Sequence, residues 1–280
     1  MPELPEVETV VTGLQRRVAD DMIDSVWIGS RRQPLKSSPA AIARALEGKR
    51  ILRVHRAGKH IVFDLEARER TRTESAAESG KGPSHWVVHL GMTGRILVTE
   101  PSAEVPKHTH LIAKLASGRE LRFIDPRMFG RISVHAAGFD PGGVEPLEIS
   151  EDRFMELFRS RKTPIKSALL NQKLLRGIGN IYADESLFRA GIRPRRRASK
   201  ISRAELARLY RAVREVLREA IALGGSSISD YVDSDGEEGS FQLEHRVYGR
   251  EGEPCSTCGS KIRRVVIAGR SSHYCPKCQK

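Results

Sequence analysis

Four cysteines near the end of the chain constrain its fold more than any other feature. They form two Cys-x2-Cys pairs with sixteen residues between them: Cys255 and Cys258, then Cys275 and Cys278. Two such pairs on either side of a β-prone run match a tetrahedral zinc site with four thiolate ligands, and a redox or iron–sulfur role is the less favoured alternative. Because no cysteine lies elsewhere in the 280 residues, a disulfide framework is disfavoured. With four protein ligands, the ion is expected to be structural and not catalytic.

The chain is strongly basic, which limits the kinds of partner it is expected to bind. Lys and Arg number 48 against 35 Asp and Glu, and basic residues are concentrated without any acid at 193–200. This excess favours a polyanionic partner, most commonly nucleic acid. An anionic membrane surface is possible on charge alone, but no amphipathic basic helix at either end supports it. Since the sequence has neither a long apolar stretch nor a signal sequence, we expect a cytoplasmic protein.

The apolar pattern of the first half predicts a β-rich domain preceded by a helix. The helix is expected to begin after Leu4, because Pro5 suits a first-turn position and apolar residues follow at helical spacing. A small helix is expected at 40–46, and the polar residues 67–84 are interpreted as an exposed loop. Several short β-prone runs suggest a β-sandwich or barrel. These runs are Ile51–Val54, Ile61–Phe63, Trp86–Leu90, Arg95–Val98, Leu111–Leu115, Glu120–Ile124 and Arg131–Val134.

The second half of the chain has a helical pattern and is expected to form a separate domain. Glycine, proline and acidic residues at 137–146 interrupt the strand pattern and mark a linker. Four helical segments follow, and the glycines at 224–225 are expected to end the last of them before a polar loop. The predicted helix-start signals are Ser150, Thr163–Pro164, Asn180 and a capping box formed by Ser202 and Glu205.

The first residues of the chain offer a candidate nucleophile. If Met1 is removed, as a small second residue normally allows, Pro2 becomes a terminal secondary amine beside the carboxylate of Glu3. An α-amino group titrates at about 7.7–8.0, so a useful fraction is neutral near physiological pH. On its own, however, such a stretch is more often a frayed terminus.

Several short motifs are compatible with contacts to nucleic acid, although each also has a purely structural explanation. The glycine-rich segment 175–180 precedes a helix and suits either phosphate binding or a tight turn. The turns at 89–94 and 125–130 carry apolar, cationic and aromatic side chains of the kind that fill the space left by an extracted base, or they are ordinary turns. Lys59 follows a glycine, and Arg270 lies between the cysteine pairs, where it is either a phosphate contact or a solvated turn residue.

Together these stretches resemble the formamidopyrimidine-DNA glycosylase family, bacterial repair enzymes that remove oxidised purines. The resemblance spans the chain through PELPEVE, AGKH, HLGMTG, DPRMFG, GIGNIYADESLFRAGI, SDG, VYGREGEPC and CPKCQK. It implies a two-lobed α+β fold, with an N-terminal β-sandwich flanked by helices and a C-terminal helix-two-turn-helix domain with a four-cysteine zinc finger. Duplex DNA containing oxidised bases or abasic sites is the implied partner, bound between the lobes by a monomeric, nucleoid-associated enzyme.

The resemblance also implies roles for individual residues. Pro2 is similar to the nucleophile that attacks the sugar of the damaged nucleotide and forms a Schiff base, after which the flanking phosphates are expelled by β,δ-elimination. Glu3 resembles the acid/base that assists sugar ring opening, Glu6 a residue of the lesion pocket, and Lys59 a phosphate contact near the lesion. The implied catalytic set is Pro2, Glu3, Lys59 and Arg270, and the implied DNA contacts are His89, Met92, Arg127, Phe129, Lys166, Asn180, Tyr248 and Arg270.

The resemblance also implies domain boundaries, and the sequence departs from the family pattern in two places. We expect a catalytic domain at 1–136, a linker at 137–149, a helix-two-turn-helix domain at 150–225, a mobile lesion-capping loop at 226–246 and the zinc finger at 247–280. Met128 stands where the family commonly has a second basic residue, and 67–84 is longer than the usual connection.

Two other functions are compatible with part of the sequence. The related endonuclease VIII type, which favours oxidised pyrimidines, usually has Gly where this chain has Leu4. A non-catalytic DNA-binding protein is disfavoured because Pro2, Glu3 and Lys59 are intact.

Overall fold

The computed structural model describes residues 1–67, 84–227 and 231–280, which form two compact units. Unit 1 contains residues 1–2, 6–140 and the described part of 227–239, and unit 2 contains residues 3–5, 141–226 and 240–280. The predicted exposed loop at 67–84 lies almost entirely outside the described residues. Among those residues, no helix has the length and apolar character needed to cross a membrane.

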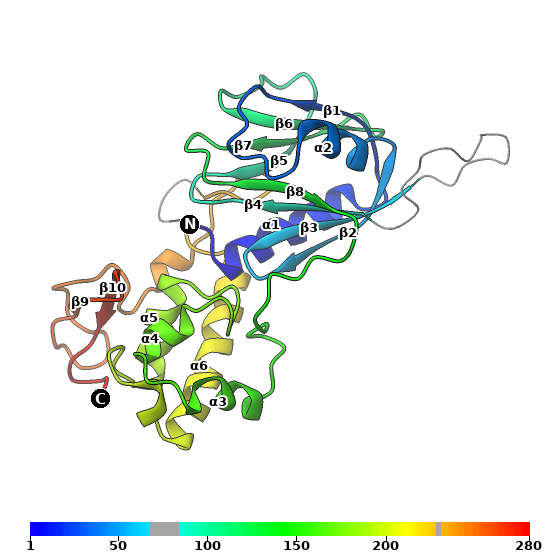
Figure 1. The fold of residues 1–280 in the computed structure, drawn as a ribbon. Helices are drawn as coiled ribbons and strands as arrows, with labels where there is room; N and C mark the ends of the chain where they lie inside the picture. The colour runs from blue at the N-terminus through cyan, green and yellow to red at the C-terminus, as the bar shows by residue number, and fades with distance from the viewer. Residues whose placement is uncertain (68–83, 228–230) are drawn as a thin grey trace. The chain divides into compact units, whose positions relative to one another are not determined.

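Unit 1 is built on one antiparallel sheet of eight strands, in the order β5-β7-β6-β1-β2-β3-β4-β8 (Figure 1). Apolar side chains from both halves of the sheet enter a single buried cluster, in which Trp86 stacks on Phe63 with ring centroids 4.3 Å apart. The predicted β-sandwich is therefore confirmed. The strands are β1 (Met22–Ile28), β2 (Lys49–Ala57), β3 (His60–Ala67), β4 (Ser84–His89), β5 (Arg95–Thr99), β6 (Thr109–Leu115), β7 (Glu120–Ile124) and β8 (Arg131–His135).

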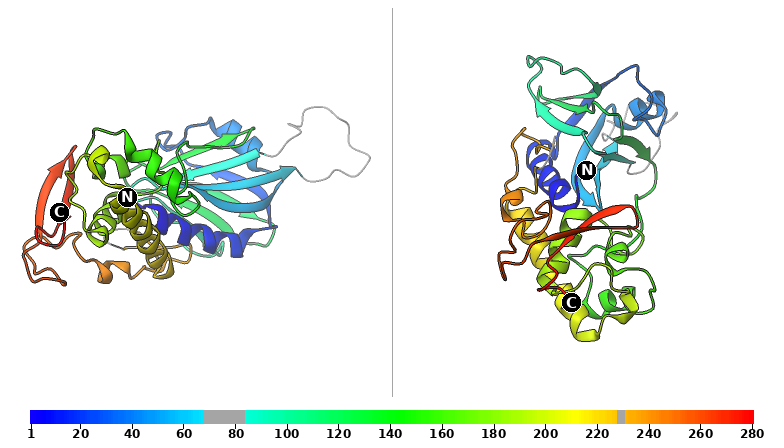
Figure 2. Two further views of the ribbon diagram at one scale, coloured as in Figure 1. Left: turned by 90° about the horizontal axis from the view of Figure 1, so that it is seen from below. Right: turned by 90° about the vertical axis from the view of Figure 1, so that its left-hand side faces the viewer.

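Two helices accompany the sheet. The long helix α1 (Leu4–Val18) lies along one face of the sheet (Figure 2), where its apolar residues from Val7 to Val18 join the same core. The shorter α2 (Pro39–Leu46) has Ser38 as its N-cap, whose side chain accepts the N–H of Ala41. The first helix was predicted from Pro5 and from the helical spacing of its apolar residues, and the small helix predicted at 40–46 is confirmed as α2.

Unit 2 is mainly helical and ends in a small hairpin (Figure 1). Ser150 caps α3 by accepting the N–H of Arg153, and Ser202 and Glu205 form the predicted capping box of α6. The glycines at 224–225 follow α6 with positive φ, as expected. The elements are α3 (Glu151–Arg159), α4 (Ile165–Leu169), α5 (Asn180–Ala190), η1 (Ala198–Lys200), α6 (Arg203–Ala222), η2 (Phe241–Glu244), β9 (Arg263–Ile267) and β10 (Arg270–Tyr274).

One predicted helix cap is wrong. Asn180 is the first residue of α5, and Gly179 occupies the N-cap position without a side-chain cap. The helix terminus is instead satisfied from a distant part of the chain, because the Ile181 N–H donates to the Glu3 carboxylate at 3.3 Å. The side chain of Asn180 is thereby left to make other contacts.

Candidate functional site

The residues in front of α1 are packed, so this stretch is not a frayed terminus. Pro2 is buried in unit 1, and Glu3, in unit 2, is only 5% exposed. The N–H of Leu4 donates to the carbonyl of Gly177 at 3.0 Å, and the Leu4 side chain is fully buried in the helical core. Gly177 has φ +91°, and a Cβ there would approach the Leu4 side chain to 2.8 Å. The backbone directly after Pro2 is therefore held in place by this hydrogen bond and by the packing of Leu4.

Glu3 lies at the N-terminus of α5. Its Oε1 accepts the N–H of Ile181, and a Cβ at Gly179 would come within 2.1 Å of the Glu3 carboxyl carbon. Glycine at 179 is therefore required for this close approach. The exposed N–H groups and the dipole of a helix N-terminus stabilise a carboxylate. The glycine-rich segment predicted to bind phosphate holds a carboxylate of the chain itself.

A buried ion pair lies beside this carboxylate. The Nζ of Lys166 is 2.6 Å from Oδ1 of Asp184, and neither side chain is exposed. The same Nζ donates to the carbonyl of Ser271 at 2.6 Å, while Oδ2 of Asp184 accepts the backbone N–H of His273 at 2.9 Å. Burial lowers the pKa of Lys166, and the charges of Asp184 and Glu3 oppose that shift. The predicted DNA contact Lys166 is thus an interior residue that links α4, α5 and β10.

A second buried acid positions Tyr248. The Glu185 carboxylate accepts three consecutive backbone N–H groups, those of Arg246, Val247 and Tyr248, at 2.8 to 3.0 Å. Burial raises the pKa of Glu185, and the three N–H donors oppose the rise. Burial likewise raises the pKa of Tyr248, whereas a hydrogen bond with Asn180 lowers it. Unit 2 therefore brings the predicted residues Tyr248 and Asn180 into contact.

The finger hairpin contributes to the same region. Asn180 Nδ2 donates to the hydroxyl of Ser271 at 3.3 Å, and Arg270, the first residue of β10, is exposed and acts electrostatically on Lys166. The predicted residues are thus linked within unit 2 by hydrogen bonds or by charge: Glu3, Lys166, Asn180, Tyr248 and Arg270. An exposed guanidinium beside buried polar groups is available to an anionic ligand.

In unit 1, two turns present three exposed side chains. Met92 is 40% exposed and Phe129 is 49% exposed, and the guanidinium of Arg127 lies 5.0 Å from the Phe129 ring centroid. The turns are joined because Thr93 Oγ1 donates to Asp125 Oδ1 at 2.5 Å and accepts the N–H of Arg127 at 3.3 Å. Large apolar side chains held exposed on a rigid support suit insertion into a ligand rather than core packing.

These two turns also approach each other through backbone. A Cβ at Gly91, where φ is +66°, would lie 2.5 Å from the backbone of Phe129 and Gly130. Met128 has φ +56°, a left-handed conformation uncommon for a residue other than glycine. The non-basic residue at this position is therefore part of the turn geometry that orients its neighbours.

His89 is held neutral beside Lys59. Burial, then the charges of His60, Arg131 and Lys59, lower the pKa of His89 to about 3. Its Nδ1 lies 3.0 Å from the N–H of Gly91, so that nitrogen accepts and Nε2 carries the proton. Lys59 is 8% exposed and follows Gly58, which has φ +60°. The electrostatic coupling places two predicted DNA contacts, Lys59 and His89, close together in unit 1.

Glu6 is buried in unit 1 and is 2% exposed. Tyr231, from the predicted capping loop, donates its hydroxyl to the Glu6 carbonyl at 3.2 Å. Burial, followed by the charge of Glu6, raises the pKa of Tyr231. Ser234 packs on Gly13, and Val98 donates to its carbonyl. Residues 231–239 of the loop are therefore part of unit 1, whereas 226 and 240–246 belong to unit 2.

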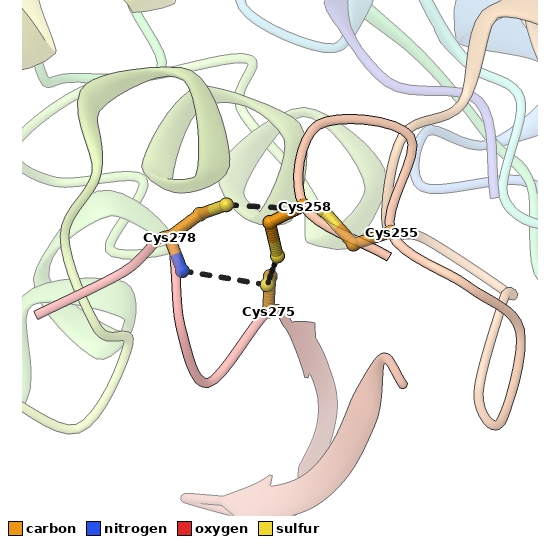
Figure 3. Close-up of side chains that lie close together, drawn as sticks. All are labelled: Cys255, Cys258, Cys275 and Cys278. Carbon is orange, nitrogen blue, oxygen red and sulfur yellow. Dashed lines mark hydrogen bonds between the residues drawn. The ribbon is translucent and has the colours of Figure 1, made fainter. Parts of the chain in front are cut away.

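The four cysteines converge as the spacing predicted (Figure 3). Their sulfurs all lie within 4.8 Å of one another. Cys255 Sγ is 3.9 Å from Cys278 Sγ, and Cys258 Sγ is 3.4 Å from Cys275 Sγ. Tetrahedral thiolates at about 2.3 Å from an ion are about 3.8 Å apart. The Cys278 N–H also points at Cys275 Sγ. The donor set fits a tetrahedral metal ion, and no position is left for a substrate.

The basic run at 193–200 is used mostly within the chain. Arg193 donates to the carbonyls of Pro276 and Gln279, and Arg196 pairs with Glu205 at 2.5 Å. Gln279 is fully buried and donates to the carbonyl of Ile192, while its Oε1 accepts the N–H of Cys275. These arginines therefore join the cysteine module to the helices. A count of charges alone cannot distinguish arginines that make such internal contacts from arginines that bind a ligand.

Sequence reasoning missed the positioning residues Asp184, Glu185 and His273. The available signal was two adjacent acids in a helix whose neighbours are apolar, because buried carboxylates need partners. Nothing in the local pattern identifies Lys166 or the backbone at 246–248 as those partners.

Comparisons with known proteins match the whole chain. Family models match residues 1–132 (formamidopyrimidine-DNA glycosylase N-terminal domain), 143–232 (formamidopyrimidine-DNA glycosylase H2TH domain) and 252–280 (zinc finger found in FPG and IleRS). A formamidopyrimidine-DNA glycosylase of Solibacter usitatus is 46% identical over 284 residues, covering 100% of both chains.

Two similar solved structures contain damaged DNA. A variant of the Lactococcus lactis FPG protein in complex with Fapy-dG-containing DNA has TM-score 0.86 and 32% identity, covering 100% of both chains. The Lactococcus lactis Fpg complex with DNA containing an abasic site has TM-score 0.85 and 32% identity, covering 99% of both chains.

Proposed function

The chain belongs to the formamidopyrimidine-DNA glycosylase family, and we propose that it excises oxidised purines from duplex DNA and then cleaves the strand at the resulting abasic site. The observation that carries the proposal is the fixed course of the chain at Pro2 and Glu3. A helix N-terminus holds the Glu3 carboxylate at the residue directly after the candidate nucleophile. Relatives bound to Fapy-dG DNA and to abasic DNA support both steps.

Pro2 supplies the nucleophile after Met1 is removed. Its nitrogen attacks the anomeric carbon of the damaged nucleotide, and the bond from that carbon to the base breaks with the electron pair leaving on the base. The Glu3 carboxylate takes the proton that the Pro2 nitrogen loses and transfers it to the ring oxygen as the sugar opens, giving an iminium ion on Pro2. The iminium makes the adjacent sugar protons acidic, so each of the two phosphates is expelled by elimination.

Other side chains hold the DNA and fill the space of the extruded nucleotide. Met92 and Phe129 enter the base stack, and Arg127, oriented by the Phe129 ring, faces the unpaired cytosine. Lys59 and Arg270 neutralise phosphates, which makes affinity fall steeply with salt. Asn180 contacts a phosphate through hydrogen bonds from its amide. His89 is proposed to donate a hydrogen bond to the DNA from Nε2, and Tyr248 is a further proposed contact. Lys166 is buried, so it is proposed to act on the DNA indirectly, through its hydrogen bond to Ser271.

The ion that the cysteines hold is proposed to be zinc. When bound, it keeps the finger folded so that β9 and β10 present Arg270. We further propose a mobile lesion-capping role for 226–246 and action as a monomer.

A trapping assay tests the proposed chemistry. The protein is incubated with a duplex containing 8-oxoguanine opposite cytosine in the presence of sodium borohydride, which reduces the iminium to a stable amine. We expect a covalent protein–DNA adduct and, without borohydride, a cleaved strand. Full DNA binding with no adduct on any lesion would identify a non-catalytic binding protein. Stronger trapping with oxidised pyrimidines would favour the endonuclease VIII type.

Pro2→Gly is expected to lower base excision far more than DNA binding, because it changes the nucleophile and leaves the basic surface unaltered. Pro5→Ala is the matched control, since it alters the same stretch without touching the terminal amine, and it should retain the adduct. Mass spectrometry of each protein verifies that Met1 is absent. Equal loss of excision and binding in Pro2→Gly would contradict the assignment of the nucleophile.

A further inference from the structure

Five of the nine histidines lie on four adjacent strands of unit 1: His55, His60, His85, His89 and His135. Side chains alternate along a strand, and the core takes Ile61, Phe63 and Leu65 from β3. His60 and Asp64 of β3 therefore lie on the opposite face of the sheet. A small apolar cluster of Ala57, Val62 and Val87 covered by Phe139 separates the histidines at the two ends of this face.

At the end away from Lys59, the strand register aligns ligand-forming side chains in a row. Asp64 on β3 pairs with His85 on β4, and His85 pairs with His135 on β8. His55 on β2 pairs with Val62, so it lies diagonal to Asp64. Directly opposed residues have Cβ atoms about 4.5–5.5 Å apart, a spacing that one ion can bridge.

The side chains already converge on one atom. Oδ1 of Asp64 lies 2.8 Å from Nδ1 of His85 and 3.2 Å from Nε2 of His55. The three side chains are 16% to 29% exposed, so water and ions reach them. His135 is next in the row, with Nε2 2.9 Å from the hydroxyl of Ser133.

We propose that His55, Asp64 and His85 form a second metal site, for a late first-row divalent ion such as Ni²⁺ or Zn²⁺, with His135 as an additional ligand. Two imidazoles and a carboxylate are a donor set that these ions bind well. The site bridges β2, β3 and β4, so a bound ion ties three strands together. Asp64 lies five residues along the chain from Lys59, about 16 Å at 3.3 Å per residue, which separates the site from the proposed phosphate contact.

The site closes when the ion binds. Among the described residues, the cysteine quartet is the one group of three or more ligands whose atoms all lie within 4.8 Å of one another. His55 and His85 must therefore rotate so that both nitrogens face the ion instead of the carboxylate oxygen. Each ring nitrogen that now donates to Asp64 becomes a ligand when its proton moves to the other nitrogen of the ring, so each imidazole stays neutral.

Calorimetric titration of Ni²⁺ into untagged, zinc-loaded, full-length protein tests the proposal, with metal analysis before and after. One Ni²⁺ per chain is expected in addition to the zinc, without loss of zinc, together with an increase in the melting temperature of unit 1. His55→Gln and His85→Gln should each weaken Ni²⁺ binding by at least about tenfold, the effect of losing one ligand or its support. His108→Asn, which changes an exposed histidine outside the row, should bind as the parent does.

Two results would overturn the proposal. One is that the zinc-loaded parent protein binds no Ni²⁺, or binds it only in exchange for zinc. The other is Ni²⁺ binding that is undiminished in both His55→Gln and His85→Gln, because the ion would then lie elsewhere, for example on the thiolates. Melting curves without added metal and DNA binding of each variant verify that the fold is retained, and two independent substitutions keep the test valid if one of them fails to fold.

Discussion

Replacement of Asp184 by Asn should destabilise unit 2 strongly. Asp184 provides the negative charge next to Lys166, at 2.6 Å, and both side chains are fully buried. The amide can still accept a hydrogen bond from His273, but it cannot compensate the ammonium charge. Breaking a buried ion pair by removing one partner costs about 3–5 kcal/mol, because the remaining charge is left without compensation. Domain stabilities are about 5–15 kcal/mol, so this is a large fraction of the total.

The measurement uses the different optical signals of the two units. Both tryptophans, Trp27 and Trp86, lie in unit 1, whereas the longest helix, α6, lies in unit 2. Urea unfolding followed by circular dichroism at the helical band therefore reports mainly on unit 2, and tryptophan fluorescence reports on unit 1. We expect Asp184→Asn to shift the first curve to lower urea and to leave the second nearly unchanged.

Asp152→Asn is the matched control, because it breaks an ion pair with Arg203 at 2.8 Å in which both side chains are 80% exposed. Exposed pairs contribute about 0–1 kcal/mol, so little change is expected. The double variant Lys166→Met with Asp184→Leu removes both charges and should recover part of the lost stability. Recovery is incomplete because the Ser271 carbonyl and the His273 N–H lose their partners. The reasoning is refuted if Asp184→Asn costs no more than Asp152→Asn, or if the double variant is as unstable as Asp184→Asn.

Two further predictions concern pH and metal. Burial lowers the pKa of His245 from 6.5 to about 4. The unfolded chain therefore binds the proton more strongly than the folded protein does, so the free energy of unfolding should fall by up to about 3 kcal/mol as pH drops from 6.5 towards 4. At still lower pH this histidine should cause no further loss of stability. Unfolding curves across that range should show a shallower loss for His245→Gln, and an unchanged slope would argue against this titration. Chelation of the metal, or Cys275→Ser, should weaken DNA binding by unfolding the finger. A DNA-binding titration, with the metal content measured in parallel, tests this. If the affinity for DNA is unchanged although the metal has been lost, the finger is not part of the proposed interface.

The sequence by itself determined the elements whose signals are local. The capping box of Ser202 and Glu205, the Ser150 cap and the glycines after α6 each act within a few residues, so their chemistry is visible in the sequence. The cysteine spacing predicted the sulfur cluster for the same reason, since each Cys-x2-Cys pair forms on one turn. Strands β2 to β8 followed from β-prone runs, whereas β1 was not predicted, and the family motifs identified the proposed site residues.

Only the tertiary structure decided which charged groups are paired. Glu3 caps α5 across 178 residues of sequence, which is why the local prediction of an Asn180 cap was wrong. Lys166 contacts Ser271 across 105 residues, and the row of Asp64, His85 and His135 depends on the register of three strands. A local pattern specifies what each segment forms. The partner of a buried charge is fixed by packing and register between distant segments, because only there does desolvation make pairing necessary.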